Sequence, residues 1–419
     1  MEGIGRLSRS LDFLSHSLLD IAIGMYVYTY PANRDSLDFV LNRPSDFIVS
    51  EIVNGLNTEE LYGYLETVGG SNTEDGCYRD ATYIVKKIGL SSIELCNTIK
   101  KVLGCRHCAV LGLKDANSVA YQLVLVRNCR TVDSNLHFRK GSRTVDAYLW
   151  LCNRISVIDI ENSFKIRLNL LSQNSMNLVK EKIETMKKYG YTILNFFGYQ
   201  RFGSRRPTTH IVGKKLICRD WEGFIEAVCG YPFPMESREA IIDRLHWYEN
   251  RSSAAYPSSS IESRICSKNI DDLRTLKAIP KKMLQLYVNA YQSYLFNTIL
   301  SRIWIEIIEK YGLDNGIEII KRDLPYLPIP GSSTTVSRDI VKRILDEILD
   351  TEDIKLSDFC IEELNLCIHG DYRRSYLVIE DLSYSVSDSS IKITFTLESG
   401  SYATIVLREI LNTDPILYT

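Results

Sequence analysis

The stretch GLKDANSVAYQ, residues 112–122, lies between two apolar runs, and the rest of the chain can be interpreted outward from it. Ala109–Leu111 precedes it and Leu123–Val126 follows it, a pattern that predicts two strands joined by a short loop. Lys114 and Asp115 interrupt the apolar pattern where the first strand ends. Charged groups at the end of a buried strand must be paired, hydrogen-bonded or exposed at a cleft. On this local pattern alone, an ordinary surface turn with both charges solvated is the favoured interpretation, because a single aspartate at a strand end is a weak signal.

Composition places the chain among globular proteins of more than one domain. It has 419 residues, 45% hydrophobic and 24% charged, with a formal net charge of −2. This length predicts two or three domains. The charge excludes a globally basic nucleic-acid-binding chain but still allows a local basic patch. No apolar run reaches the length of a membrane span and no signal peptide is recognisable, so we expect a cytoplasmic protein.

The 11 cysteines show no framework spacing, which predicts buried thiols in a reducing compartment. Cys105 and Cys108 form the one CxxC pattern, which could be half a zinc site, a redox pair or a helix-to-strand junction. No second CxxC follows, so we favour the junction and expect no metal.

The first half of the chain is predicted to form mainly strands. We predict a helix over residues 1–20, and the predicted strands are then Ile21–Tyr30, a half-buried Asp46–Glu51, Leu61–Val68, Leu149–Ile160 and Phe164–Leu171, the last two separated by Glu161–Ser163. Ser91 and Glu94 fit a capping box for a helix that Gly104 ends, directly before the strand leading to Asp115. Ser175–Lys188 predicts a further helix.

The segment Asn195–Arg206 (NFFGYQRFGSRR) interleaves aromatic residues with arginines. Aromatic faces can stack on bases and arginine pairs with phosphate, so the segment could contact RNA through Arg201, Arg205 and Arg206. It could equally be a buried aromatic turn whose arginines extend to solvent.

A mainly helical region follows, before strand character returns near the C-terminus. Helices are predicted over Trp221–Glu249, Pro280–Tyr311 and Val336–Leu349, with a Ser-rich mobile connection at Arg251–Asn269 and a Pro-rich loop at Leu324–Ser333. A meander is predicted over Ser375–Leu382, Ile391–Leu397 and Ala403–Ile410. This order suggests an α+β domain interrupted by an insertion.

Six motifs in a fixed order make the chain resemble the TruD family of pseudouridine synthases, in particular its archaeal and eukaryotic-type members. They are Pro44–Glu51 (PSDFIVSE), Gly112–Gln122, Asn162–Phe164 (NSF), Asn195–Gly203 continued by Arg206–Gly213, Ala290–Asn297 (AYQSYLFN) and Gly400–Glu409 (GSYATIVLRE). The resemblance implies a pseudouridine-synthase α+β domain with a mixed, mainly antiparallel sheet, interrupted by an inserted, mainly helical TRUD domain. The domain ranges would be 1–220 and 370–419 for the catalytic domain and 221–369 for the insertion.

The resemblance also implies roles for individual residues. Asp115 matches the catalytic aspartate, while Phe47, Asn162 and Tyr402 fall where the family contacts the target uridine and Phe164 falls near the base. From the residues alone, the favoured interpretation of Phe47 and Phe164 is that they are plain core residues. Ser118, Ala120 and Glu161 depart from the family pattern, and only Arg43 stands where a lysine often precedes the DF motif. The cationic partner of Asp115 is therefore open between Lys114 and Arg43, and Lys114 joins the substrate-binding candidates.

We thus expect an isomerase that converts uridine to pseudouridine in tRNA, with uridine-13 as the implied target. The reaction needs no redox step and no group donor, so no cofactor is expected. The partner would be tRNA or another structured RNA, and the protein a monomer with no membrane association. The alternative from another class is a non-catalytic RNA-binding or RNA-folding module that uses the same cleft.

Overall fold

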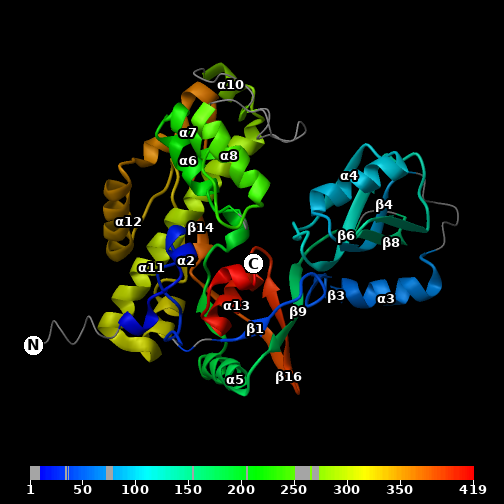
Figure 1. Cartoon of the computed structure of the whole chain (residues 1–419), viewed down its shortest axis with the longest axis horizontal. Coiled ribbons are helices and arrows are strands. Elements are labelled where there is room, and N and C mark those ends of the chain that lie inside the picture. Colours follow the sequence, from blue (N-terminus) through cyan, green and yellow to red (C-terminus); the bar gives the residue numbers. More distant parts are fainter. Residues whose placement is uncertain are drawn as a thin grey trace, which may run out of the picture. The chain divides into compact units, whose positions relative to one another are not determined.

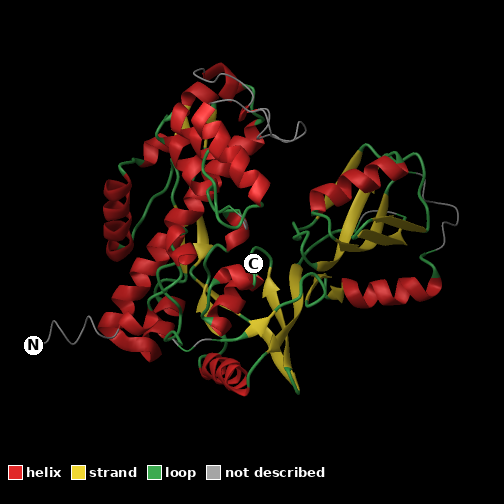
Figure 2. Cartoon of the chain, viewed as in Figure 1, coloured by secondary structure: helices red, strands yellow, loops and turns green. Residues whose placement is uncertain are grey.

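The computed structural model describes residues 10–33, 35, 37–71, 79–152, 155–203, 206–250, 265–266 and 273–419. The chain forms two compact units, each built from separate stretches of sequence. The sheet unit comprises Ser36–Glu181 and Val378–Ala403, and the helical unit comprises Met1–Asp35, Lys182–Leu377 and Thr404–Thr419. Figure 2 shows most strands in the first and most helices in the second. These limits differ from the predicted domain ranges 1–220, 221–369 and 370–419, which stay a prediction.

An eleven-stranded sheet forms the sheet unit, in the order β16-β17-β9-β2-β6-β4-β8-β7, with β1, β3 and β5 attached beside this path. The strands are β1 (Phe39–Val40), β2 (Phe47–Val53), β3 (Leu56–Asn57), β4 (Ala81–Ile88), β5 (His107–Val110), β6 (Val119–Arg127), β7 (Asn135–Lys140), β8 (Arg143–Leu151), β9 (Ile160–Leu170), β16 (Glu380–Ser387) and β17 (Ser390–Glu398). β2 and β6 pair in parallel, and the other pairings are antiparallel. The predicted mixed, mainly antiparallel sheet is confirmed.

Two helices cover opposite faces of one half of this sheet, as Figure 1 shows for α3 (Thr58–Val68) and α4 (Ser92–Leu103). Successive strand residues point to opposite faces. Val85 of β4 accordingly packs in one core with residues of α4, whereas the adjacent Ile84 packs with α3. The predicted capping box at Ser91 and the helix end at Gly104, where φ is 63°, are both present.

The helical unit is built around α11 (Lys281–Arg322), which bends at Gly312. Its other α-helices described in full are α2 (Leu18–Ala22), α6 (Thr209–Ile217), α7 (Trp221–Cys229), α8 (Arg238–Asn250), α10 (Leu273–Lys277), α12 (Asp339–Glu352) and α13 (Ala403–Leu411), while α5 (Gln173–Lys188) crosses the sequence boundary between the units. Short strand pairs join β10 (Thr192–Leu194) to β15 (Tyr376–Val378), β11 (Tyr326–Ile329) to β14 (Asp371–Arg374), and β12 (Cys360–Ile361) to β13 (Leu366–Cys367). A Cβ on Gly213 of α6 would lie 2.1 Å from the Tyr287 carbonyl oxygen of α11, so only glycine allows this approach. No described helix is long and apolar enough to cross a membrane.

Several predicted strands are wrong because periodicity alone does not separate short strands from buried helices. Leu61–Val68 belongs to α3, whose cap is Asn57, and Ala403–Ile410 forms α13, which is buried nearly all round. Ile21–Tyr30 contains the end of α2 and then irregular chain, in which the Thr29 N–H donates to the Glu409 carboxylate.

Other boundaries also differ from the sequence prediction. β8 ends at Leu151, and Glu161–Ser163 lies inside β9 because the ladders with β2 and β17 run through it without a break. β2 is buried along most of its length, not half-buried. Residues 1–9 of the predicted first helix lie outside the described residues, as does nearly all of Arg251–Asn269.

The prediction that the cysteines are thiols is wrong for three pairs in the described chain. Disulfides join Cys105 to Cys129, Cys229 to Cys266 and Cys360 to Cys367. The first two pairs are 24 and 37 residues apart in sequence, so spacing gives no sign of them. Cys105 follows α4 and Cys108 lies in β5, which confirms the helix-to-strand junction.

A fully buried ion pair ties together the ends of the helical unit. The Arg408 guanidinium of α13 donates to Asp20 at 2.7 Å and contacts Glu409 at 3.3 Å, and none of the three side chains is exposed. The Tyr199 hydroxyl donates to the second Asp20 oxygen at 2.6 Å. These contacts give the Arg-Glu of the last motif and the tyrosine of NFFGYQRFG a structural role.

We expect Asp20→Ala to destabilise the protein by about 3–5 kcal/mol, because it leaves the Arg408 charge buried without its main partner. Denaturant unfolding would measure the loss. The matched control is Asp323→Ala, which removes an exposed partner of Arg322 and should leave the unfolding midpoint unchanged. Equal shifts for the two variants would contradict this account.

Candidate active site

Asp115 lies in the loop between β5 and β6, and its backbone is held from several sides. The ammonium of Lys87, on β4, donates to the Asp115 carbonyl at 2.7 Å, and the Ser118 hydroxyl donates to the same oxygen at 2.9 Å. The Asp115 carboxylate accepts a hydrogen bond from the Asn117 N–H at 3.2 Å, and a third of its side chain is exposed. The loop therefore presents one accessible carboxylate on a fixed backbone.

Arg43 is the cation beside this carboxylate. One of its terminal nitrogens lies 3.4 Å from Asp115 Oδ2, and its side chain is only 7% exposed. The guanidinium also lies 4.0 Å above the ring of Phe47. Burial lowers the pKa of Arg43, and the neighbouring Asp115 opposes that shift. Arginine stays charged in proteins, so the site keeps a fixed positive charge here.

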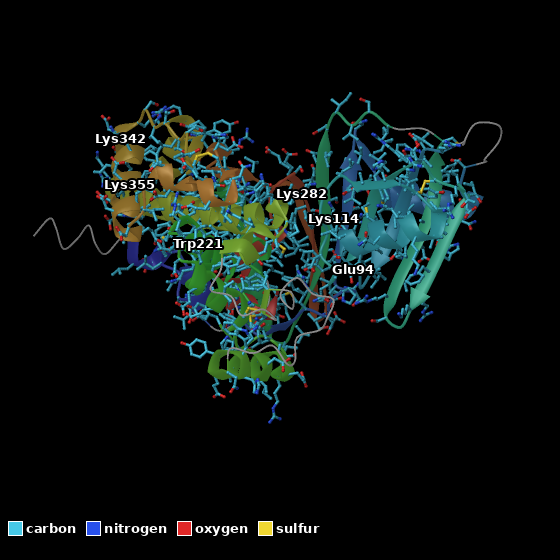
Figure 3. All side chains as sticks on the ribbon, turned by 90° about the horizontal axis from the view of Figure 1, so that it is seen from above. Glu94, Lys114, Trp221, Lys282, Lys342 and Lys355 are labelled. Carbon is cyan, nitrogen blue, oxygen red and sulfur yellow. A yellow bond between two sulfur atoms is a disulfide. The ribbon has the colours of Figure 1, made fainter. Side chains whose placement is uncertain are left out.

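Lys114 has a different partner. Its ammonium lies 2.8 Å from Glu51 Oε1, the Glu51 side chain is fully buried, and the other Glu51 oxygen accepts the Leu123 N–H at 2.8 Å. The Lys114 backbone N–H donates to the Ser92 hydroxyl at the start of α4. Figure 3 labels Lys114 close to Glu94, which lies in the first turn of that helix. Of the two candidate cations, Arg43 contacts Asp115 and Lys114 holds the loop to the sheet.

Phe47, Asn162 and Phe164 lie on one face of the sheet. Asn162 is directly opposite Glu51 across β9 and β2, and Phe164 is opposite Val49. Opposed residues in an antiparallel pair share a face, and so do alternate residues of one strand. The rings of Phe47 and Phe164 meet edge to face, with centroids 6.2 Å apart. The sheet thus gathers these residues on the face where Glu51 binds Lys114, the neighbour of Asp115.

Asn162 carries a buried acceptor. Its side-chain oxygen makes no hydrogen bond within the described part of the chain, although Asn162 is only 9% exposed. Most buried polar atoms in proteins have a partner, so this oxygen is able to accept a hydrogen bond from a bound molecule or a water. Phe164, by contrast, is packed between Phe47 and Phe395, the latter with centroids 5.3 Å away.

Tyr402 follows β17 in the same unit and is half-buried. Glu398 is the last residue of β17 and pairs with Glu161, and Leu397 pairs with Asn162. The segment carrying Tyr402 therefore leaves the sheet at the end where Asn162 lies.

The arginines of the Asn195–Arg206 segment belong to the helical unit. Arg206 donates to the carbonyls of Val228 at 3.0 Å and Tyr231 at 2.7 Å, and also to that of Ala227, so it caps the end of α7. Arg201 donates to the Ser293 hydroxyl at 3.1 Å. Arg205 lies outside the described residues. The aromatic residues Phe196, Tyr199 and Phe202 are buried core residues, whereas Phe197 is half-buried.

Lys87 and Glu51 are the site residues that the sequence interpretation missed. Lys86 and Lys87 are adjacent in a strand, so one of the two must point into the structure, and this was the available signal. Lys87 is fully buried and donates to the carbonyls of Asp115 and Leu90. Burial lowers its pKa to about 8, against the opposing effect of the Asp115 charge. Glu51 ended a quoted motif, but its partner Lys114 could not be assigned from spacing.

Comparisons with known proteins identify the family of the chain. The family model "tRNA pseudouridine synthase D (TruD)" matches residues 23–317 and 309–410. A protein named a probable tRNA pseudouridine synthase D from Saccharolobus solfataricus is 32% identical over 410 residues, covering 96% of this chain and 99% of the relative. One of the same name from Sulfurisphaera tokodaii is 30% identical, covering 95% and 100%. A crystal structure from Methanosarcina mazei, assigned to TruD, has a TM-score of 0.67 at 22% identity and covers 95% of this chain and 99% of its own.

The fold is therefore that of a pseudouridine-synthase-type α+β protein. The chain belongs to the tRNA pseudouridine synthase D (TruD) family.

We expect Lys87→Met to remove a pH dependence of stability. The buried ammonium has a pKa of about 8, whereas an unfolded lysine titrates near 10.4, so the unfolded chain binds the proton more tightly. The penalty for burying this charge is complete below pH 8 and is relieved between about pH 8 and 10.4. Relative to Lys87→Met, the wild type should therefore gain stability across that window, by up to about 3 kcal/mol.

Denaturant unfolding at several pH values between 7 and 10 checks this difference. Lys86→Met is the matched control, since Lys86 is the preceding residue of β4 and is only half-buried. A constant difference between wild type and Lys87→Met over the whole range would contradict the expected coupling.

Proposed function

We propose that this chain converts uridine to pseudouridine in tRNA, with Asp115 as the catalytic carboxylate and uridine-13 as the target. The observation that carries the proposal is the accessible Asp115 carboxylate, fixed beside the buried Arg43 cation in the loop of the family's GxKD motif. Membership of the family, and the names of relatives that match nearly the whole chain, support the reaction and the substrate.

The reaction rearranges bonds without a net change in composition. The N1–C1′ bond breaks, the uracil turns, the C5–C1′ bond forms, and the proton lost from C5 is balanced by one gained at N1. A carboxylate suits this chemistry because it can act as a nucleophile or base at the sugar and can stabilise positive charge there. Asp115 would do so with Arg43 orienting one carboxylate oxygen and the Asn117 N–H orienting the other.

The target uridine must leave its stack to reach Asp115, at a cost of a few kcal/mol. We assign Phe47 and Tyr402 to contact with the everted nucleotide, and the free oxygen of Asn162 to an N–H or O–H donor of the uridine. Phe164 would hold the ring of Phe47 in place through their edge-to-face contact. Lys114 would act mainly by keeping the loop on Glu51.

Of the arginines in the Asn195–Arg206 segment, Arg201 is the better candidate for a phosphate contact. It is half-exposed, and one nitrogen is bound to the Ser293 hydroxyl. The contacts of Arg206 with three carbonyls favour a structural role instead. We further propose that residues 221–369 act as the inserted TRUD domain.

The central test compares the wild type with Asp115→Asn on an unmodified tRNA transcript, mapping pseudouridine by position. Asn keeps the size of the side chain and removes its charge, so we expect at least about a 10³-fold loss of rate with tRNA binding retained. Equal modification by both proteins would reject Asp115 as the catalytic group. Modification away from position 13 would reject only the target assignment. Binding without modification by the wild type would favour the non-catalytic alternative.

A second test addresses Arg43. We expect Arg43→Gln to lower kcat by about 10²-fold, because it removes the charge that orients Asp115, whereas Arg43→Lys should retain more of the rate. Single-turnover kinetics at saturating tRNA would measure both variants. The control is Arg338→Gln, an exposed arginine of the helical unit. A wild-type rate for Arg43→Gln would overturn this role.

A further inference from the structure

Six cations gather around the turn from α4 to β5, at the other end of the sheet unit's β6 from Asp115. They are Arg79, Lys100, Lys101, Arg106, Arg127 and Arg130, here called the turn patch. Five are exposed and Lys100 is half-buried. None of the six has a carboxylate oxygen within 4.0 Å in the described part of the chain. The whole chain carries a net charge of −2, so this local excess does not reflect general basicity.

The backbone beneath the turn patch is tightly connected. The Arg106 N–H donates to the Arg127 carbonyl at 3.1 Å, the Arg130 N–H to the Leu103 carbonyl at 3.0 Å, and the Cys129 N–H to the Arg79 carbonyl at 3.0 Å. The Cys105–Cys129 disulfide crosses the same turn.

Gly104 lets the Arg130 stem pack on this turn. A Cβ at Gly104 would lie 2.8 Å from Arg130 Cδ, so a side chain here would displace the stem. The arginines are therefore mounted on a rigid frame, which lowers the entropy lost when a ligand binds.

Helix electrostatics explain only part of the turn patch. Lys100 and Lys101 lie in the last turn of α4, where cations favour the carbonyl end of a helix. The four arginines lie outside the helix, so its carbonyl end does not stabilise their charges in this way. The nearby Asp80 uses one carboxylate oxygen to accept the Asn128 N–H. The cluster thus carries a repulsion that a polyanion would relieve.

We infer that the turn patch binds backbone phosphates of the RNA substrate at a distance from the target uridine. The inference rests on the proposed RNA substrate. The guanidinium fork matches phosphate geometry, and phosphate contacts position a nucleic acid without reading its sequence. From Val119 to Arg127, β6 spans about 26 Å, so the contacted phosphates belong to a part of the RNA well beyond the target loop. The turn patch would therefore favour an RNA long enough to reach it from the target uridine.

The test uses the full chain with Arg106, Arg127 and Arg130 all changed to Gln, and two probes. One is an unmodified tRNA transcript, and the other is a short hairpin carrying the same target uridine. With tRNA, we expect the slope of log affinity against log salt to fall by about 2–3, with KM raised about 10-fold and kcat unchanged. The hairpin should bind and react as it does with the wild type.

Two further variants control the experiment. The same three positions changed to Lys should recover the wild-type salt slope, because charge and not shape dominates this term. Lys310, Arg338 and Lys342 changed together to Gln remove equal charge from the helical unit, where Figure 3 labels Lys342, and should leave the sheet-unit contact intact.

A wild-type salt slope and KM for the first variant with tRNA would overturn the inference, as would an equal loss with the hairpin. Failure of the wild type to form pseudouridine would instead count against the proposed function. The slope of log tRNA affinity against log salt tests the turn patch whether or not pseudouridine forms.

Discussion

Glu51 places a carboxylate in the middle of the sheet, where no part of its side chain is exposed. A buried charge must be compensated or it destabilises the fold severely. Compensation comes from the Leu123 N–H of β6 and from the Lys114 ammonium of the loop before β6. This one carboxylate therefore links β2 both to β6 and to the loop that carries Asp115. Lys87 holds the same loop from β4.

The carboxylates of Glu51 and Asp115 have different partners and different exposure, and therefore different roles. Glu51 is fully buried and takes Lys114, so it is committed to structure. Asp115 is partly exposed and takes Arg43, whose nitrogen lies 3.4 Å away and whose guanidinium rests on Phe47. The short loop makes the separation possible, because Lys114 and Asp115 are adjacent and their side chains reach different partners. The Asp115 carboxylate thus stays partly exposed, while the charge of its neighbour Lys114 is satisfied by Glu51.

The sequence could indicate what depends on local patterns and ordered motifs. The capping box of α4, its end at Gly104, the mixed sheet and the family follow from residues that act locally or in long motifs. The sequence could not show whether Lys114 or Arg43 is the cationic partner of Asp115. Both lie in or next to a motif, and only the folded arrangement of the strands distinguishes them. Leu61–Val68 and Ala403–Ile410 were wrongly predicted as strands, because the same pattern of apolar residues also fits a helix that packs on the core. The Cys105–Cys129 and Cys229–Cys266 disulfides were missed because contacts distant in sequence bring their cysteines together.

The departures from the family pattern gain a physical interpretation from their surroundings. Ser118 donates to the Asp115 carbonyl, so the small polar residue helps to hold the loop. Glu161 pairs in regular register with Ile52 and Glu398, so the residue before Asn162 leaves the sheet undisturbed. Arg43 replaces a lysine at a position that contacts the carboxylate, and its planar group also stacks on Phe47, which an ammonium would do less well. Ser118 and Arg43 therefore contribute directly to the contacts that hold Asp115, and Glu161 leaves the strand that carries Asn162 regular.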